Sequence, residues 1–148
     1  MIRKALEADI PELLNMAQAL VAESSYCFIN PSLPRIEVTI KTMIAQGFAM
    51  VAVIDDKPIG VMLGDVYMPW YSEDMLGIDY TIYVYPQHRN GLIAFKLIKA
   101  FEKWAFGMGA KQIRCGVGTD VVGVGRLYEK LAFKNVGAWY CKNKPHGI

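Results

Sequence analysis

The sequence predicts a mixed α/β fold, with helices on both faces of one mixed sheet. Strand-like apolar runs and helix-like apolar stripes follow one another along the chain in the order βααβββαβαβ. The early strands are joined by a short turn, which favours antiparallel pairing, whereas the later strands alternate with helices. A length of 148 residues is typical of one domain, so we expect a single domain over residues 1–148.

The first third of the chain predicts one short strand and two helices. The strand covers residues 2–6, and a helix begins at Asp9, whose carboxylate can cap free backbone amides while Glu12 stands three residues later, as in a capping box. Apolar residues then recur at helical spacing: Ile10, Leu13, Leu14, Ala17, Leu20 and Val21. A loop over 24–34 leads to a second helix over 35–45, which Gly47 ends.

The rest of the chain predicts a sheet that is interrupted by two more helices. The longest helix runs from Arg89 or Gly91 to Phe106 and is followed by two glycines. A shorter helix covers residues 125–131. The predicted strands cover residues 48–54, 58–67, 77–85, 111–117 and 133–142, with a hairpin turn at 55–57.

Composition excludes several classes of protein. The net charge of +2 is small and the basic residues are scattered, so a nucleic-acid partner is not expected. The longest apolar run, residues 48–54, is far shorter than the ~20 residues of a membrane span. Acidic residues occupy the place where a signal peptide would need an apolar core, so we expect the protein to stay in the cytoplasm.

The cysteines and histidines predict neither a disulfide framework nor a metal site. Cys27, Cys115 and Cys141 are odd in number and none has CxxC spacing, which fits free thiols in a reducing compartment. His88 and His146 stand apart from any ligand cluster.

The segment over residues 83–94 carries the most chemical information. It places a strand, a short basic turn with Gly91, and the long helix in direct succession. The start of a helix presents unpaired amides and the positive end of the helix dipole, which together suit phosphate oxygens, and Arg89 adds a cation. The alternative is a plain strand-to-helix connection that uses Gly91 only for its turn.

This segment resembles the acetyl-CoA pyrophosphate motif of the GNAT superfamily of N-acetyltransferases, roughly V-x-P-x-x-R-G-x-G-x-G/A. Asn90 and Leu92 stand where that motif has glycines. Residues 126–133 resemble the family's L-Y-E-K-L-G-F segment, with Ala132 in place of its glycine. Residues 2–5 and 109–113 also resemble family segments, so the resemblance covers nearly the whole chain in the right order.

The resemblance implies a mostly antiparallel, twisted sheet of six to seven strands, with two central strands splayed apart. It implies an acyltransferase that moves an acetyl group from acetyl-CoA, as cosubstrate and without a metal, to a primary amine by direct attack through a tetrahedral intermediate. The acceptor, a small molecule or a peptide, stays open. The implied donor-binding residues are Ile82, Tyr83, Val84, Arg89, Asn90, Gly91, Leu92, Ile93, Ala94 and Tyr128.

Two residues are the candidates for catalysis within this resemblance. Tyr128 is the expected proton donor to the departing thiolate, because a phenol is protonated at neutral pH; alternatively it only packs. Asp79 is the first candidate for general base or amine-positioning group; alternatively it is a solvated carboxylate. Weaker base candidates are Glu23, Glu73, Asp74 and an ordered water.

Other interpretations stay open. The glycines over residues 116–123 superficially resemble a dinucleotide fingerprint, but their GxGxxxxG spacing favours a flexible loop beside the donor. The aromatic residues Trp70, Tyr71, Tyr80, Tyr83 and Tyr85 form either a packed sheet face or an acceptor pocket. The main rival is a non-catalytic acetyl-CoA-binding or interaction domain. The exposed edge of the last predicted strand makes a homodimer conceivable.

Overall fold

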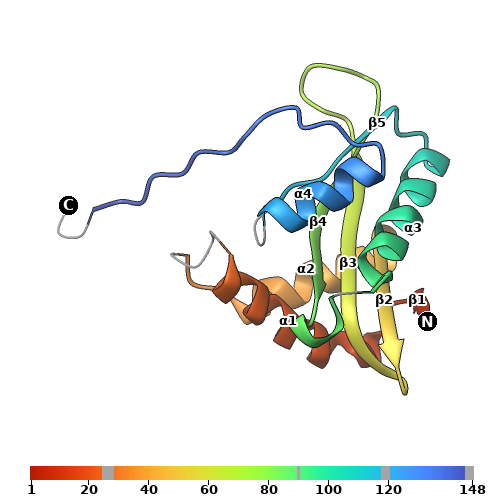
Figure 1. The fold of residues 1–148 in the computed structure, drawn as a ribbon, viewed down its shortest axis with the longest axis vertical. Helices are drawn as coiled ribbons and strands as arrows, with labels where there is room; N and C mark the ends of the chain where they lie inside the picture. The colour runs from red at the N-terminus through yellow and green to blue at the C-terminus, as the bar shows by residue number, and fades with distance from the viewer. Residues whose placement is uncertain (25–28, 90, 118–120, 146–148) are drawn as a thin grey trace.

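A computed structural model describes residues 1–24, 29–89, 91–117 and 121–145 (Figure 1). Within these residues the sheet has five strands in the order β1-β2-β3-β4-β5. The strands are β1 (Ile2–Lys4), β2 (Phe48–Ile54), β3 (Lys57–Tyr67), β4 (Leu76–Val84) and β5 (Gln112–Arg114). The helices are η1 (Glu7–Asp9), α1 (Ile10–Glu23), α2 (Leu33–Gln46), η2 (Pro86–His88), α3 (Ile93–Gly107) and α4 (Val121–Lys130).

The mixed α/β class, with helices on both faces of a mostly antiparallel sheet, is confirmed. Strands β1 to β4 pair antiparallel, and β5 joins β4 in parallel. The β2–β3 hairpin closes through Asp55 and Asp56, whose φ angles of 50° and 61° are both positive. Two such residues form the turn whose twist matches that of the flanking strands, so the predicted hairpin turn lies where expected.

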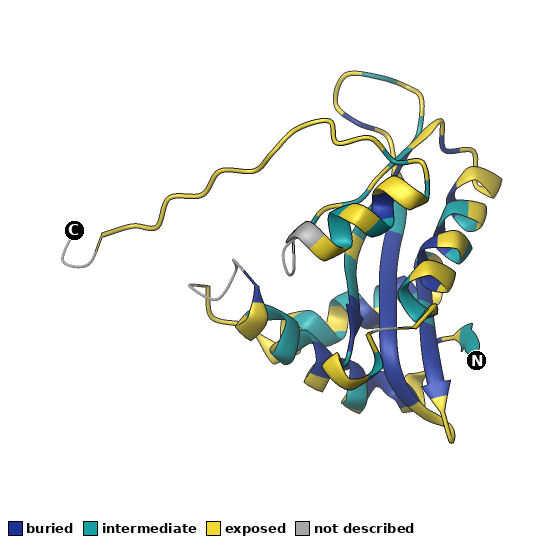
Figure 2. Cartoon of the chain, in the orientation of Figure 1, coloured by how far each residue is buried: buried dark blue, intermediate teal, exposed yellow. Residues whose placement is uncertain are grey.

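Two hydrophobic clusters form the core, one on each face of the sheet. Helices α1 and α2 contribute Leu13, Met16 and Ile40 to one of them. Helix α3 contributes Leu97 and Phe101 to the other. Figure 2 shows the buried strands between these layers. Gly64 on β3 permits the second cluster, because a Cβ at this position would lie 2.5 Å from the Phe101 ring.

Strands β4 and β5 pair over only three residues each. The pairing ends at Ile78 and Arg114, and β4 continues to Val84 without a described strand on that side. This is the place where the resemblance predicts that two central strands separate. The unpaired part of β4 leads directly into η2 and then α3 (Figure 1).

The prediction of six to seven strands is wrong for the described part of the chain, because residues 133–142 form no strand. Ala132 turns the chain with a φ of 66°, and Phe133 packs on Tyr128 at a ring distance of 5.1 Å. From residue 134 the chain then runs away from the body of the molecule (Figure 1). Trp139 and Tyr140 are 97% and 93% exposed there. A strand needs a partner backbone, and no described strand lies beside this C-terminal segment.

The capping box predicted at Asp9 and Glu12 is also wrong. Asp9 lies in η1, and its carboxylate accepts hydrogen bonds from the Leu6 amide at 2.8 Å and from Arg3 at 2.7 and 2.9 Å. The hydrogen bond from Arg3 lowers the pKa of Asp9 despite the opposing effect of burial. The carboxylate of Asp9 therefore caps the preceding turn, because the neighbouring guanidinium of Arg3 holds it there.

None of the described helices has the length and apolar character to cross a membrane.

Candidate active site

The free edge of β4 is the first component of the site. The Tyr85 amide donates to the Ile59 carbonyl of β3 at 3.0 Å. Antiparallel strands alternate the direction of their backbone groups, so the amides and carbonyls of Ile82 and Val84 point away from β3. The Val84 carbonyl is indeed reached from that side, by Arg89 Nε at 2.7 Å. Both backbone groups of Ile82 and the amide of Val84 can therefore pair with an extended ligand, whereas the Val84 carbonyl already accepts a hydrogen bond from Arg89.

The start of α3 is the second component. Helix α3 begins at Ile93 without a side-chain cap and without an acidic residue in its first turn. Its first helical hydrogen bond runs from the Lys96 amide to the Leu92 carbonyl, at 2.9 Å. The amides before Lys96 therefore lack helical acceptors. Leu92 is 65% exposed, and a Cβ at Gly91 would meet no atom within 4 Å.

These features fit a diphosphate. Open amides at the positive end of a helix bind phosphate oxygens through hydrogen bonds and charge. The predicted positions Gly91, Leu92, Ile93 and Ala94 all lie at this helix start. Asn90, which was predicted with them, lies outside the described residues.

Arg89 lies differently from the position expected of a phosphate-binding cation. Its Nη2 is 2.8 Å from Glu23 Oε2, and its guanidinium lies 5.1 Å from the centre of the Tyr83 ring. The Tyr83 hydroxyl donates to Glu23 Oε1 at 2.8 Å. The guanidinium is thus directed toward the end of α1, and sequence reasoning missed its partner because 66 residues separate the two.

This arrangement makes Glu23 a poor base. Burial raises its pKa, but hydrogen bonds from Arg89 and Tyr83 outweigh burial and leave the pKa below its ordinary value. Burial and the contact with Glu23 raise the pKa of Tyr83 to about 12. The two other weak candidates, Glu73 and Asp74, are exposed residues between β3 and β4.

A bulge in β4 directs Asp79 toward α4. Leu63 pairs with Thr81 and the next residue, Gly64, pairs with Asp79, so Tyr80 is an extra residue on β4. An extra residue re-aims the side chains beside it. Asp79 Oδ1 accepts a hydrogen bond from the Gly116 amide at 3.1 Å. Burial raises the pKa of Asp79 to about 6, although the hydrogen bond from Gly116 lowers it.

Tyr128 lies on the same side of the sheet as Asp79. Its side chain is 6% exposed, and its hydroxyl lies 3.4 Å from the Gly116 carbonyl. Burial raises the pKa of Tyr128, and the neighbouring Cys115 and Asp79 raise it further. The structure therefore brings the two predicted catalytic residues, one from β4 and one from α4, to the same residue, Gly116.

Cys115 is a member of this cluster that sequence reasoning did not single out. Burial raises the pKa of its thiol, and the nearby Asp79 adds to the effect. Its thiol lies close enough to Tyr128 for each group to affect the pKa of the other. The parallel register that pairs Ile78 with Arg114 places Asp79 beside Cys115, and no short motif in the sequence marks that register.

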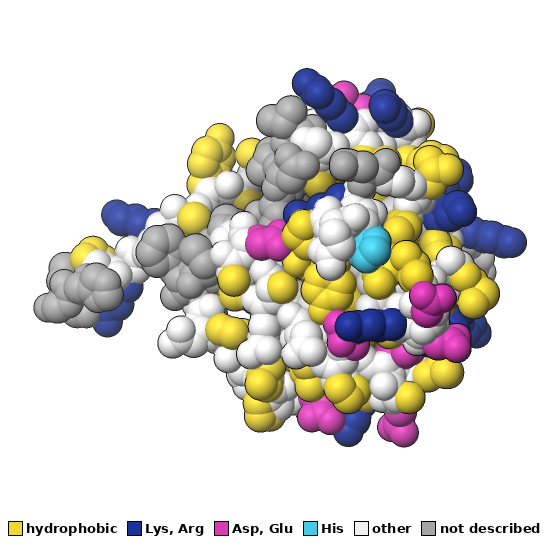
Figure 3. All heavy atoms as spheres, turned by 60° about the horizontal axis from the view of Figure 1, so that its bottom comes forward, with side chains coloured by type: hydrophobic (Ala, Val, Ile, Leu, Met, Phe, Trp, Pro, Cys, Tyr) yellow, Lys and Arg dark blue, Asp and Glu magenta, His cyan; other side chains and the backbone are white. Residues whose placement is uncertain are grey.

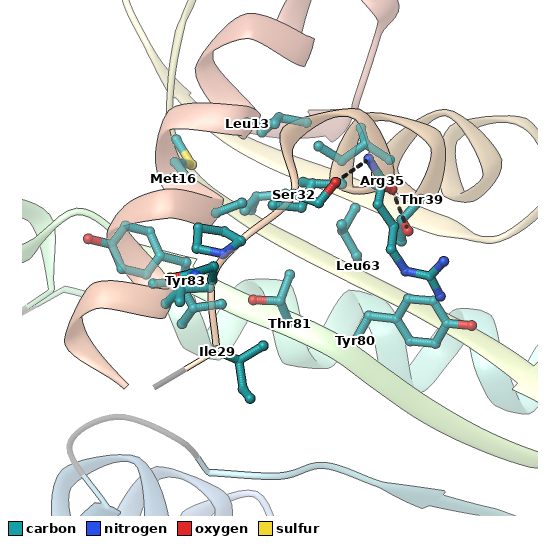
Figure 4. Close-up of a pocket in the computed structure, with 18 residues that line it drawn as sticks. Leu13, Met16, Ile29, Ser32, Arg35, Thr39, Leu63, Tyr80, Thr81 and Tyr83 are labelled. Carbon is teal, nitrogen blue, oxygen red and sulfur yellow. Dashed lines mark hydrogen bonds between the residues drawn. The ribbon is translucent and has the colours of Figure 1, made fainter. Parts of the chain in front are cut away.

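A cavity of about 320 Å³ opens between α1, α2 and β4 (Figure 4). Two of the five grouped aromatic residues, Tyr80 and Tyr83, line it. Tyr85 contacts the Tyr83 ring at 5.8 Å. Trp70 and Tyr71 lie elsewhere, as an exposed pair with ring centres 5.5 Å apart. The predicted aromatic group is therefore divided between a cavity wall and a surface loop.

An open strand edge followed by an uncapped helix defines a domain suited to an extended, phosphate-bearing ligand. The chain belongs to the acetyltransferase (GNAT) family, whose family model matches residues 15–133. The predicted family is thereby confirmed. No curated protein matches the sequence significantly.

Among the described residues, no three His, Cys, Asp or Glu side chains gather into a group that could hold a metal ion.

Solved structures share the fold at low sequence identity. An aminoglycoside acetyltransferase, meta-AAC0020, from an uncultured soil metagenomic sample in complex with sisomicin is 19% identical, with a TM-score of 0.69 over 97% of this chain and 96% of that one. The aminoglycoside N-acetyltransferase AAC(6')-Iy in complex with CoA is 15% identical, with a TM-score of 0.72 over 98% and 99%. A transcriptional regulator from Bacillus halodurans C-125 is 17% identical, with a TM-score of 0.74 over 97% and 99%.

Proposed function

We propose that this protein is an N-acetyltransferase that moves an acetyl group from acetyl-CoA to a primary amine. The observation that supports this most strongly is the direct succession of the free β4 edge and the uncapped start of α3. The amides of residues 92–94 bind the diphosphate of the donor, and the edge over residues 82–84 pairs with its pantetheine arm. A similar fold, AAC(6')-Iy, binds CoA.

The proposed chemistry uses Asp79 and Tyr128. The amine nitrogen attacks the thioester carbon, the new C–N bond forms, and the C–S bond breaks. Asp79 faces α4 and not the cavity, so it accepts the proton that the amine loses through an ordered water, which its pKa of about 6 permits at neutral pH. Tyr128 donates its proton to the sulfur and is then reprotonated from the proton on Asp79 through solvent. A backbone amide near Val84 stabilises the oxyanion of the intermediate.

The donor site is tested with a charge placed at the start of α3. Leu92→Glu puts a carboxylate beside the amides that bind the diphosphate, and it should weaken CoA binding by roughly tenfold or more in calorimetry. Met108→Glu at the other end of α3, where the side chain is also exposed, is the matched control and should bind CoA like the wild type. Equal binding by both variants, or a wild type that ignores CoA at about 1 mM, would overturn the donor site.

A non-catalytic acetyl-CoA-binding module is the second candidate. The engagement of Arg89 by Glu23 favours it, because the cation is not free for phosphate. The fold alone does not distinguish an enzyme from a binding module, since a transcriptional regulator shares this fold. Release of free CoA thiol with a panel of amines separates an enzyme from a binder.

Three further expectations stay predictions. The acceptor is a small-molecule or peptide amine. Nucleic acid is not expected as a partner, because Lys and Arg side chains are interspersed with Asp and Glu on the face shown in Figure 3. The cytoplasm is the expected compartment. A homodimer, if it forms, involves the exposed C-terminal segment over residues 134–145, where Trp139 and Tyr140 offer apolar surface.

A further inference from the structure

We propose that the cavity between α1, α2 and β4 accepts an amine with an apolar body and an anionic group, and that it rejects polycationic acceptors. This inference rests on the proposed acetyl transfer and assigns the class of its acceptor. It concerns the cavity of about 320 Å³ in Figure 4, which is at the small end of the range for small-molecule sites.

The walls of the cavity are largely apolar. Both helices and the sheet contribute, with Leu13, Met16, Leu20, Ile36, Val61 and Leu63. An apolar wall stabilises an apolar ligand by about 25 cal/mol per Å² of buried surface. A sugar ring would leave its hydroxyls without partners against such a wall, which costs more than it gains.

One polar atom inside the cavity has no partner. Thr81 Oγ1 is buried and makes no hydrogen bond with any described residue. Thr81 lies on the cavity side of β4, next to the extra residue Tyr80, while Asp79 faces α4. The Thr81 hydroxyl lies beneath the surface of the cavity wall, so it can bind a polar group of the ligand only after a small local shift of the side chains that cover it.

The charge of the cavity is positive. Arg35 is the ionisable cation among the described lining residues, and none of those residues is an Asp or a Glu. Residues 25–28, outside the described part, contain no acidic residue in the sequence either. The nearest acidic group on the end of α1, Glu23, is engaged by Arg89 and Tyr83.

The guanidinium of Arg35 is suited to an anion. It makes no ion pair with a described residue, and Figure 4 shows it extending past Tyr80 at one end of the cavity. A carboxylate there gains charge-assisted hydrogen bonds. A polycation such as an aminoglycoside meets a like charge and no counter-ion, which disfavours its binding.

The test compares two amines of the same shape on the full chain. Para-(aminomethyl)benzoate carries a carboxylate, and para-methylbenzylamine carries a methyl group in its place. We expect thiol release with a kcat/KM roughly tenfold or more higher for the benzoate, and little release with sisomicin. Arg35→Gln should abolish the difference between the two amines. Lys41→Gln, which removes a cation of α2 outside the cavity, should preserve it.

The outcomes separate the inference from the proposed function. Faster release with sisomicin than with the benzoate, or a preference for the benzoate that survives in Arg35→Gln, overturns the inference and leaves acetyl transfer standing. If no amine releases thiol, acetyl transfer fails, and binding of the two amines is then followed by chemical-shift changes of Leu63 and Thr81. Tighter binding of the benzoate, lost in Arg35→Gln, supports the acceptor class, and equal binding overturns it.

Discussion

The guanidinium of Arg89 lies 2.8 Å from the carboxylate of Glu23. Arg89 belongs to the turn before α3, and we assign this turn to donor binding. Glu23 is the last residue of α1, and other residues of α1 line the proposed acceptor cavity. The two side chains are about one-third exposed, so the pair contributes at most about 1 kcal/mol to stability. We infer that its main effect is to hold the cation away from the proposed diphosphate site.

Glu23→Gln should therefore strengthen donor binding. Without the carboxylate, Arg89 can turn toward the diphosphate, and we expect the Kd for CoA in calorimetry to fall roughly twofold to fivefold. Glu37→Gln, which breaks an exposed pair with Lys41, is the control and should leave the Kd unchanged. If the double variant Glu23→Gln with Arg89→Gln binds CoA as tightly as Glu23→Gln alone, Arg89 has no part in donor binding.

Tyr128→Phe should lower kcat by roughly a hundredfold or more, with little change in the Kd for acetyl-CoA. The ring keeps its contact with Phe133, so only the proton donor is lost. Single-turnover and steady-state thiol release measure the effect. Tyr140→Phe is the control, because Tyr140 is 93% exposed on the C-terminal segment. Wild-type turnover in Tyr128→Phe would remove the proposed acid.

The rate should depend on pH through Asp79. Its pKa of about 6 means that the carboxylate becomes ionised, and able to accept a proton, as the pH rises through 6. We expect kcat/KM to rise with pH up to about 6.5 and then level off, apart from the titration of the amine itself. Asp79→Asn should be slow at every pH. An unchanged pH profile in that variant would assign the base elsewhere.

The ionisation of Asp79 should raise kcat/KM but lower the free energy of unfolding. Its pKa rises from 3.8 to about 6 on folding, so between these values the folded state binds more protons than the unfolded state. Stability therefore falls as the pH rises through this window and is then constant. Asp79→Asn should raise the free energy of unfolding at pH 7.5 by about 1–2 kcal/mol in urea, and less at pH 4.5. Asp74→Asn, an exposed carboxylate, is the control.

The β2–β3 turn offers a test of the fold alone. Asp56 has a φ of 61°, which glycine adopts without steric cost. Asp56→Gly should raise the free energy of unfolding by about 0.5–1 kcal/mol in urea titration. Lys57→Gly, one residue later in β3, should lower it, because glycine weakens a strand. Destabilisation by Asp56→Gly would show that the aspartate side chain has a role of its own.

Truncation after Phe133 tests the C-terminal segment. Residues 134–145 are exposed and make no hydrogen bond to the rest of the described chain, so the Tm should hardly change. Sedimentation of both forms then measures the predicted homodimer, which should be present only in the full chain. Dimers of both forms would place the contact on another surface, and monomers of both would contradict the prediction.

The order of elements before the last predicted strand, and the position of the turn that precedes α3, could be predicted because both are local. Apolar spacing within ten to twenty residues marks a helix or strand, and the turn at Gly91 is contiguous with β4 and α3. The last strand could not be predicted correctly, because its formation depends on a neighbouring backbone. The Arg89–Glu23 pair joins residues that are 66 positions apart, and the Tyr80 bulge is set by packing between strands.

The extra residue at Tyr80 also separates two tasks along a single strand. Asp79 lies on the side of the strand with Tyr128, while Thr81 and Tyr83 lie on the side with the cavity. If the proposed roles hold, substitutions at cavity residues such as Leu63 and Arg35 should change the choice of amine without disturbing Asp79 and Tyr128, the proposed proton-transfer groups.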